Sequence, residues 1–131
     1  MADIRPVTPD FAVAPQLELE DLATAKTRGY VLVINNRPDG EAPDQPSSAE
    51  MQAAAEAEGL AYAYVPVVGR PGDAQVKAVA EAVSGAGGPV LAFCRSGTRS
   101  IVTWSLGQTE RPREELIRLG QAAGYDLSGV V

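Results

Sequence analysis

The chain has 131 residues, 45% of them hydrophobic, and a formal net charge of −6. This length fits one domain with a buried core, so residues 1–131 are expected to form a single domain. The acidic balance makes nucleic acid and anionic membranes poor partners, and no apolar run reaches the roughly 18 residues that a membrane span needs.

Segments with the apolar period of strands and of helices alternate along the chain, separated by turn residues. In chain order the sequence predicts extended segments at 4–7 and 11–14, a helix at 17–28 closed by Gly29, a strand at 30–35, a loop at 36–47, a helix at 49–58 capped by Ser47 or Ser48, a strand at 60–68, a helix at 73–83, a strand at 89–94 and helices at 101–106 and 112–123. This alternation predicts an α/β domain with a mainly parallel central sheet and helices on both faces.

Three of the expected strands end in segments that we expect to border one cleft, because ligands of such sheets bind beyond the carboxyl ends of the strands. These segments are the long loop at 36–47, the turn at 69–73 and the stretch that begins with Cys94. A loop of a dozen residues is long for a compact domain, which indicates a functional role for it.

The stretch CRSGTRS, residues 94–100, lies between a buried strand and the helix expected at 101–106, in which Trp104 is a core residue. A strand, a glycine-containing turn and a helix start gather backbone N–H groups around one point, toward which the positive end of the helix dipole is directed. This arrangement predicts an anion site, where a cysteine is favoured as a thiolate. We therefore interpret Cys94 as a partly exposed nucleophile rather than an inert core cysteine.

Residue types that are absent narrow the chemistry. Cys94 is the only cysteine and there is no histidine. Cys–His and Ser–His–Asp systems within the chain are thereby excluded, as are zinc sites built from His and several Cys, and we expect no metal and no cofactor. A lone thiol fits a reducing compartment, and the N-terminus shows no apolar signal segment, so a cytoplasmic protein is expected.

Four stretches carry a resemblance to a known family: NNRPDGE at 35–41, Pro66-Val67, PVLAFCRSGTRS at 89–100 and AGYDLS at 123–128. Together they resemble the bacterial beta-lactamase hydrolase-like, phosphatase-like domain family over nearly the whole chain. The resemblance implies the fold of dual-specificity tyrosine phosphatases. It also implies a persulfide dioxygenase-like metallohydrolase as a partner, because some members are fused to such enzymes or encoded beside them. It leaves the reaction open.

The spacing of the cysteine and the arginine separates two reactions. Phosphatases of the resembled fold carry His-Cys and then five residues before Arg, whereas here Phe93 precedes Cys94 and four residues separate it from Arg99. A shorter cradle suits one sulfur atom better than a phosphoryl group, and Cys-Arg-Ser-Gly-x-Arg-Ser is similar to the active loop of rhodaneses. The main interpretation is rhodanese-like sulfur transfer through a Cys94 persulfide. The alternatives are a phosphatase that forms a phosphocysteine and a non-catalytic anion-binding regulatory module.

Roles follow for the individual residues, with thiosulfate, a persulfide or a phosphate ester as the small anionic substrate. Arg99 is expected to bind the anion through its planar fork, and Ser100 to donate to the thiolate or to cap the helix. Asp73 is a candidate acid, although a helix N-cap is favoured for it; Asp39 and Asp44 are further candidates, each favoured as a turn residue. The expected substrate-binding residues are Arg37, Arg95, Ser96, Gly97 and Thr98.

Overall fold

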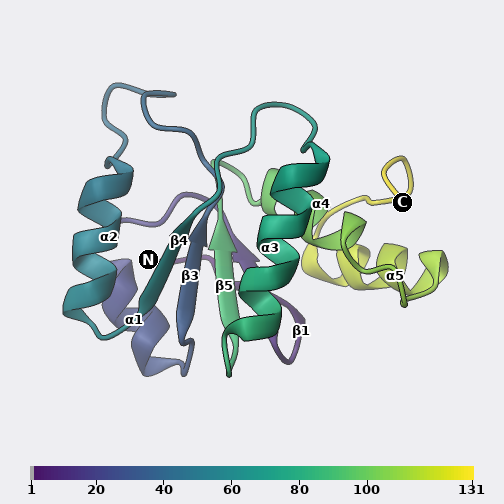
Figure 1. Ribbon diagram of the computed structural model, residues 1–131, viewed down its shortest axis with the longest axis horizontal. Coiled ribbons are helices and arrows are strands. Elements are labelled where there is room, and N and C mark those ends of the chain that lie inside the picture. Colours follow the sequence, from purple (N-terminus) through teal and green to yellow (C-terminus); the bar gives the residue numbers. More distant parts are fainter. Residues whose placement is uncertain (1) are drawn as a thin grey trace.

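In the computed structural model, which describes residues 2–131, five strands form one sheet in the order β1-β2-β5-β3-β4 (Figure 1). The strands are β1 (Arg5–Thr8), β2 (Phe11–Ala14), β3 (Leu32–Asn35), β4 (Ala61–Tyr64) and β5 (Val90–Phe93). β1 pairs antiparallel with β2, and every other pair is parallel. The predicted α/β fold with a mainly parallel sheet is confirmed.

Five helices cover the two faces of this sheet, as the alternating pattern predicts. They are α1 (Asp21–Thr27), α2 (Ser48–Ala57), α3 (Asp73–Gly85), α4 (Thr98–Leu106) and α5 (Arg113–Ala123). Apolar residues of α1 and α2 form one core with the sheet, and those of α3, α4 and α5 form the other, which agrees with the two sides seen in Figure 1. No helix among residues 2–131 combines the length and the apolar character needed to cross a membrane.

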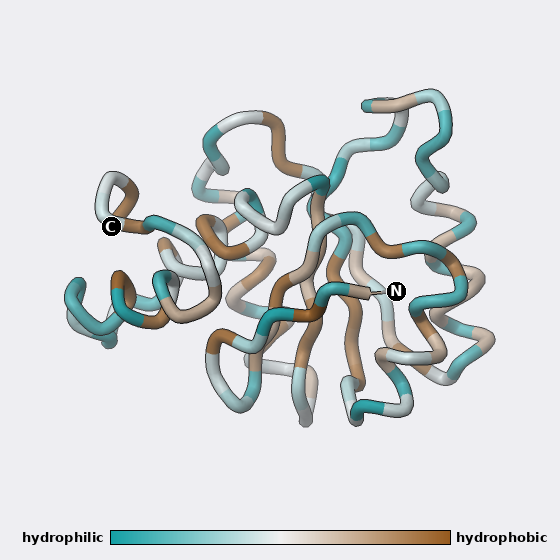
Figure 2. The backbone as a smooth tube through the Cα atoms, turned by 180° about the vertical axis from the view of Figure 1, so that it is seen from behind, coloured by the Kyte–Doolittle hydropathy of each residue, from teal (hydrophilic) through white to brown (hydrophobic). Residues whose placement is uncertain are grey.

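The central strand β5 explains why both faces must be covered. Val90 and Ala92 belong to one core, while Leu91 and Phe93 belong to the other, because successive side chains of a strand point to opposite faces. All four residues are buried, and the strands run as hydrophobic segments through the middle of the molecule (Figure 2). Trp104 is 3% exposed, as predicted for a core residue.

Several predicted ends are wrong, each for a local reason. α1 begins at Asp21 rather than at residue 17, because the Asp21 carboxylate accepts the Glu18 N–H and holds a turn before the helix. β4 ends at Tyr64, two residues before Pro66, which cannot donate to a strand ladder. The predicted cap Ser47 is confirmed, since Glu50 N–H donates to its hydroxyl.

The two helices nearest the expected site also start at other residues than predicted. Asp73 is not the N-cap of α3: Gly72 takes that position and Asp73 is the first helical residue. α4 begins at Thr98, three residues before the predicted start, with Gly97 as its N-cap. Arg99 and Ser100 therefore lie in the first turn of α4 and not in the loop before it.

Candidate active site

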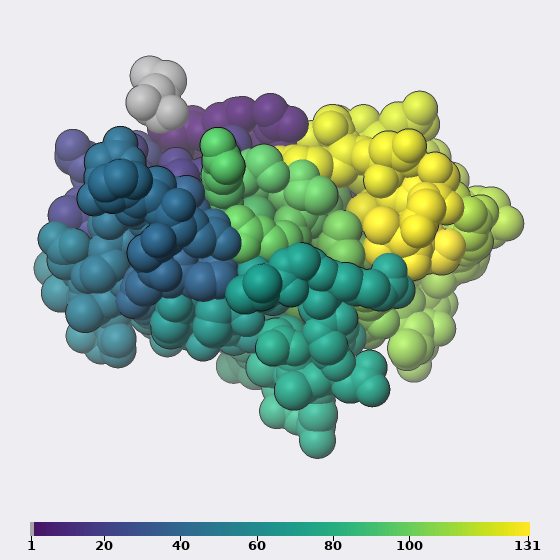
Figure 3. Space-filling model, turned by 90° about the horizontal axis from the view of Figure 1, so that it is seen from above, coloured from purple at the N-terminus to yellow at the C-terminus, as the bar shows by residue number. Residues whose placement is uncertain are grey.

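The segments that follow β3, β4 and β5 meet at the carboxyl edge of the sheet. Asn36 N–H donates to the Phe93 carbonyl (2.8 Å), and Val67 N–H donates to the Asn36 carbonyl (2.9 Å). In Figure 3, seen from above this edge, the green loop and start of α4 lie among the blue loop after β3, the teal segment after β4 and the yellow C-terminal residues. The expected convergence of the three segments is confirmed. The segment after β4 makes its contact through Val67, which comes before the predicted turn at 69–73.

Cys94 follows β5 directly and is fully buried, so the predicted partial exposure is wrong. The reason is that the adjoining backbone is hydrogen-bonded to the last residue of β2 and to the segment after it. Cys94 N–H donates to the Ala14 carbonyl (3.4 Å), and Gln16 N–H donates to the Arg95 carbonyl (3.2 Å). The sulfur itself accepts a hydrogen bond from Gly97 N–H at 3.1 Å.

The loop between Cys94 and α4 keeps unpaired backbone donors. Thr98 N–H donates to the Ser96 hydroxyl (3.4 Å), whereas the N–H groups of Arg95 and Ser96 donate no hydrogen bond within the described chain. The first N–H groups of a helix have no intrahelical partner, and the N-cap Gly97 of α4 has no side chain to accept from them. Free N–H groups at a helix start are the donors that an anion takes.

Arg99 is held by a carboxylate that sequence reasoning missed. Its Nη1 donates to Glu41 Oε2 (2.7 Å) and to the Val67 carbonyl (2.8 Å), and its Nη2 donates to Glu41 Oε1 (2.9 Å). Glu41 raises the pKa of Arg99, and the nearby Cys94 adds to this increase. Nε has no partner among residues 2–131, so one edge of the fork binds Glu41 while another donor stays free for a substrate.

Glu41 joins two arginines. Its Oε1 also accepts from Arg37 Nε (3.0 Å), and Arg37 Nη1 donates to Gln16 Oε1 (3.0 Å). The Arg99 guanidinium first, and Arg37 with it, lowers the pKa of Glu41 to about 2. Glu41 is therefore ionised at neutral pH, and two guanidinium groups around one carboxylate leave this group of side chains with net positive charge.

Ser100 takes neither of the roles predicted for it. Its hydroxyl donates to Asn36 Oδ1 (2.8 Å), so its single proton does not go to the Cys94 sulfur, and Gly97 rather than Ser100 is the N-cap of α4. Asn36 in turn donates through Nδ2 to the Val65 carbonyl (2.8 Å). This buried chain of hydrogen bonds connects the first turn of α4 to the segments after β3 and β4.

None of the candidate acids Asp39, Asp44 and Asp73 hydrogen-bonds the Cys94 loop in the described part of the chain. Asp39 Oδ1 accepts the Ser48 N–H (2.7 Å), and Asp39 N–H donates to the Tyr64 hydroxyl (2.9 Å), as suits a turn residue. Asp73 is exposed at the start of α3 and makes no hydrogen bond to the Cys94 loop in the part of the chain described. Residues 2–131 also hold no group of three or more acidic or cysteine side chains placed to bind a metal ion.

A cavity of about 330 Å³ opens beside the loop. Arg37, Arg95, Glu41 and Asp44 are among the residues that line it. Arg95, Ser96 and Thr98 are exposed, as expected of residues that meet a substrate, while Arg37 is 6% exposed and held mainly by Glu41 and Gln16. The volume of the cavity falls within the usual range of small-molecule sites, roughly 300–1,000 Å³.

Two contacts of the loop come from distant parts of the sequence. Glu41, which binds Arg99, lies 58 residues from it in the sequence. Tyr125, whose hydroxyl donates to the Ser96 carbonyl (2.8 Å), lies 29 residues from Ser96. For Glu41 a signal was present, since Arg37 and Glu41 bring opposite charges to a loop already expected to be functional. For Tyr125 the only signal was its place in the AGYDLS stretch.

Comparisons with known proteins agree with this geometry. Residues 3–111 match the family model "Beta-lactamase hydrolase-like protein, phosphatase-like domain". A beta-lactamase hydrolase-like protein of Xylella fastidiosa is 39% identical over 125 residues, and one of Agrobacterium fabrum is 34% identical over 121 residues. These matches cover 92% and 89% of this chain, but the chain spans only 29% and 28% of the two relatives.

Solved structures show the same fold. A crystal structure of a candidate phosphatase from Neisseria meningitidis has a TM-score of 0.86 and 31% identity, covering 96% of this chain and 92% of that one. Tk-PTP in its active form shares the fold at a TM-score of 0.68 and 20% identity, covering 95% and 87% of the two chains. The phosphatase-like fold implied by the resemblance is thus confirmed, and the chain belongs to the family of beta-lactamase hydrolase-like protein, phosphatase-like domains.

Proposed function

We propose that the protein is a cysteine-dependent phosphatase that acts on small phosphate monoesters. The observation that carries the proposal is the environment of Cys94, whose sulfur accepts the Gly97 N–H beside the Arg99 guanidinium and below a loop with free N–H groups. The family and the fold support this reaction over sulfur transfer, since the matching family model is described as a phosphatase-like domain and the Neisseria structure as a candidate phosphatase. The relatives are much longer than this chain, so the proposal concerns the reaction of this chain and not the function of the whole relatives.

The reaction proceeds in two displacements at phosphorus. The Cys94 thiolate attacks the phosphorus atom, an S–P bond forms, the ester P–O bond breaks, and the leaving oxygen departs with the bonding electrons and takes a proton from solvent water. A second water molecule then attacks the phosphocysteine and gives a proton to solvent, the S–P bond breaks with its electrons returning to the sulfur, and inorganic phosphate leaves. The free N–H groups of Arg95 and Ser96 and the Arg99 guanidinium stabilise the charge on the phosphoryl oxygens in both steps.

Access to the sulfur requires movement of the loop. Cys94 has no exposed surface, and the four residues between it and Arg99 form a tight turn. Exposed Arg95, Ser96 and Thr98 form the outer side of that turn, so substrate binding has to widen it there. Opening the loop replaces the Gly97 N–H to sulfur hydrogen bond with hydrogen bonds to the phosphoryl oxygens.

Aryl phosphates are the substrates that this site suits best. The ionised Glu41 has no proton to give at neutral pH, and no other carboxyl group is hydrogen-bonded to the Cys94 loop in the described chain. A phenolate leaves without much protonation, whereas an alkoxide does not. Phosphotyrosine is a natural probe, because a cysteine-to-serine variant of TpbA from P. aeruginosa, at 15% identity and a TM-score of 0.64, is described in complex with pTyr.

The test is hydrolysis of p-nitrophenyl phosphate and of phosphotyrosine by the wild type and by Cys94→Ser. We expect turnover in the wild type and a loss of at least about a thousandfold in the variant, since serine is a far weaker nucleophile here. Retained binding of phosphate by Cys94→Ser, measured by calorimetry, shows that the site is intact. Binding without turnover in the wild type would favour the anion-binding module instead.

Sulfur transfer is the second candidate, and the four-residue spacing of Cys94 and Arg99 favours it. One added sulfur atom is smaller than a phosphoryl group, so it requires less widening of the tight loop over the buried thiol. Incubation with thiosulfate followed by mass spectrometry checks for an adduct of about 32 Da on Cys94. A persulfide that passes its sulfur to cyanide, without hydrolysis of either phosphate, would replace the phosphatase proposal.

A further inference from the structure

One peptide bond of the loop is held from both sides. The carbonyl oxygen of Ser96 accepts the Tyr125 hydroxyl at 2.8 Å, and the N–H of Gly97 donates to the Cys94 sulfur at 3.1 Å. These two groups belong to the same peptide unit. Because a trans peptide is planar, its C=O and N–H point in opposite directions, so the tyrosine that fixes the oxygen also fixes the direction of the N–H.

This peptide bond is one that can turn over. Gly97 has a φ of +89°, a conformation that other residues rarely adopt and that glycine exchanges readily for negative φ. A rotation of the Ser96–Gly97 peptide would direct the carbonyl oxygen toward the sulfur in place of the N–H. The sulfur would then face an acceptor, which repels a thiolate, instead of a donor that stabilises it.

We propose that Tyr125 is a positioning residue that keeps the Ser96–Gly97 peptide turned so that its N–H faces Cys94. The proposal rests on the function proposed above only in that Cys94 is the reactive group. A Cβ at Gly97 would overlap the Tyr125 hydroxyl, so the phenol lies directly against this residue. The AGYDLS stretch thereby acquires a role in the site.

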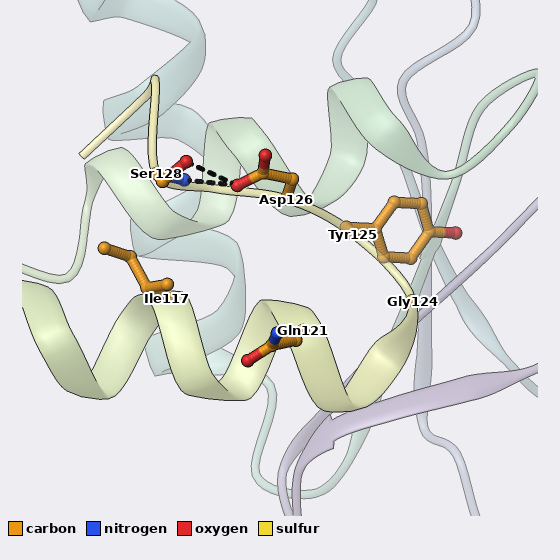
Figure 4. A pocket seen from close by; sticks show the side chains of 6 residues that line it. All are labelled: Ile117, Gln121, Gly124, Tyr125, Asp126 and Ser128. Atoms are coloured by element: carbon orange, nitrogen blue, oxygen red, sulfur yellow. Dashed lines mark hydrogen bonds between the residues drawn. The ribbon is translucent and has the colours of Figure 1, made fainter.

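Tyr125 is itself well placed for this task. Its N–H donates to the Gly120 carbonyl of α5 (2.8 Å), and the Arg5 guanidinium lies over its ring, 5.3 Å from the centroid. Burial raises the pKa of Tyr125, so its hydroxyl stays protonated and remains a donor well above neutral pH. Tyr125 also borders a cavity of about 500 Å³, and in Figure 4 its ring extends away from Asp126 and Ser128.

The experiment compares Tyr125→Phe with the wild type in the rate of Cys94 alkylation by iodoacetamide across a range of pH. Without the hydroxyl the peptide samples both orientations, and we expect the midpoint of the alkylation profile to move up by roughly half a pH unit or more. We also expect kcat for p-nitrophenyl phosphate to fall by about tenfold with little change in KM. The amide resonance of Gly97 in ¹⁵N-labelled protein should shift or broaden.

Tyr30→Phe is the matched control. Tyr30 precedes β3 at the opposite end of the sheet, and its hydroxyl makes no hydrogen bond within residues 2–131, so its removal should leave the alkylation profile unchanged. An unchanged profile in Tyr125→Phe would overturn the positioning role whether or not phosphates are hydrolysed, and so would a variant that no longer folds. A shifted profile in a protein that hydrolyses no phosphate would uphold it and overturn the proposed function.

Discussion

The guanidinium of Arg99 has two tasks that compete for the same donors. Two of its nitrogens bind Glu41, and one of them also holds the Val67 carbonyl, yet an oxyanion next to Cys94 needs donors as well. A planar fork with five N–H groups can satisfy both, whereas an ammonium group acts as a single point charge. The choice of arginine at this position therefore follows from the geometry.

Arg99→Lys should lower turnover of p-nitrophenyl phosphate by at least about tenfold, which corresponds to about 1.4 kcal/mol of transition-state stabilisation. The unfolding temperature should change little. Arg113→Lys on α5 is the control, because Arg113 also donates to backbone carbonyls but at the exposed C-terminal segment. Near-wild-type turnover in Arg99→Lys would mean that the guanidinium has only a structural role.

Asp73 stays our candidate for the acid that protonates a poor leaving group. Asp73→Asn should leave hydrolysis of p-nitrophenyl phosphate within about twofold of the wild type and lower hydrolysis of an alkyl phosphate such as phosphoserine by about a hundredfold. Asp10→Asn, in the exposed turn between β1 and β2, controls for the change in net charge. Equal losses on both substrates, or none on either, would remove Asp73 from the mechanism.

The residues of the site were predictable where they lie close together in the chain. Cys94, Gly97 and Arg99 belong to one strand-turn-helix unit, so their spacing alone indicates a common centre. Glu41 and Tyr125 reach the same centre across long stretches of chain, and no local pattern encodes such a pairing. The burial of Cys94 was missed for the same reason, because its loop is hydrogen-bonded to β2 and to the residues after it.

At the scale of elements, the long loop after β3 is fastened to α4 by an ion pair. Glu41 on this loop and Arg99 in the first turn of α4 form two hydrogen bonds, and Arg37 adds a third from within the loop. The loop is thus a fixed part of the site rather than a mobile connection between β3 and α2. Its contribution to stability depends on the charge of a single carboxylate.

That dependence has a definite sign. The folded pKa of Glu41 is about 2, below its ordinary value of 4.5, so the ion pairs stabilise the fold fully above about pH 4.5 and are lost as the pH falls toward 2. Glu41→Gln should therefore be less stable than the wild type near neutral pH, and the difference should shrink between about pH 4.5 and 2. Urea unfolding of both proteins across this range measures it. A constant difference would show that Glu41 acts through its shape and not its charge.

The order and type of most elements followed from the period of the apolar residues, whereas their ends did not. Boundaries were set by single contacts such as the Asp21 carboxylate on Glu18 N–H, which a pattern of apolar residues does not contain. The parallel sheet was predictable from the alternation of strands and helices. The antiparallel pairing of β1 with β2 was not, because neither four-residue strand carries a signal for its partner.

At the scale of the whole molecule, the reactive thiol is an interior group. Alkylation of Cys94 in the native protein must wait for the loop to open, so the rate should be at least about tenfold below that of the urea-unfolded chain at the same pH. It should level off at high iodoacetamide concentration, where opening limits the rate. Inorganic phosphate should slow it further by occupying the site. Native alkylation as fast as that of the unfolded chain would contradict the burial.

The pairing of β2 with β5 also shapes how the protein reaches its active form. Phe11 lies opposite Val90, a sequence separation of 79 residues, and the backbone of Cys94 and Arg95 hydrogen-bonds Ala14 at the end of β2 and Gln16 after it. Contacts across such long stretches of chain form late and slow the folding of a domain. The N-terminal hairpin must therefore dock before the thiol loop takes its final shape, and a refolding chain should regain activity only in its slowest phase.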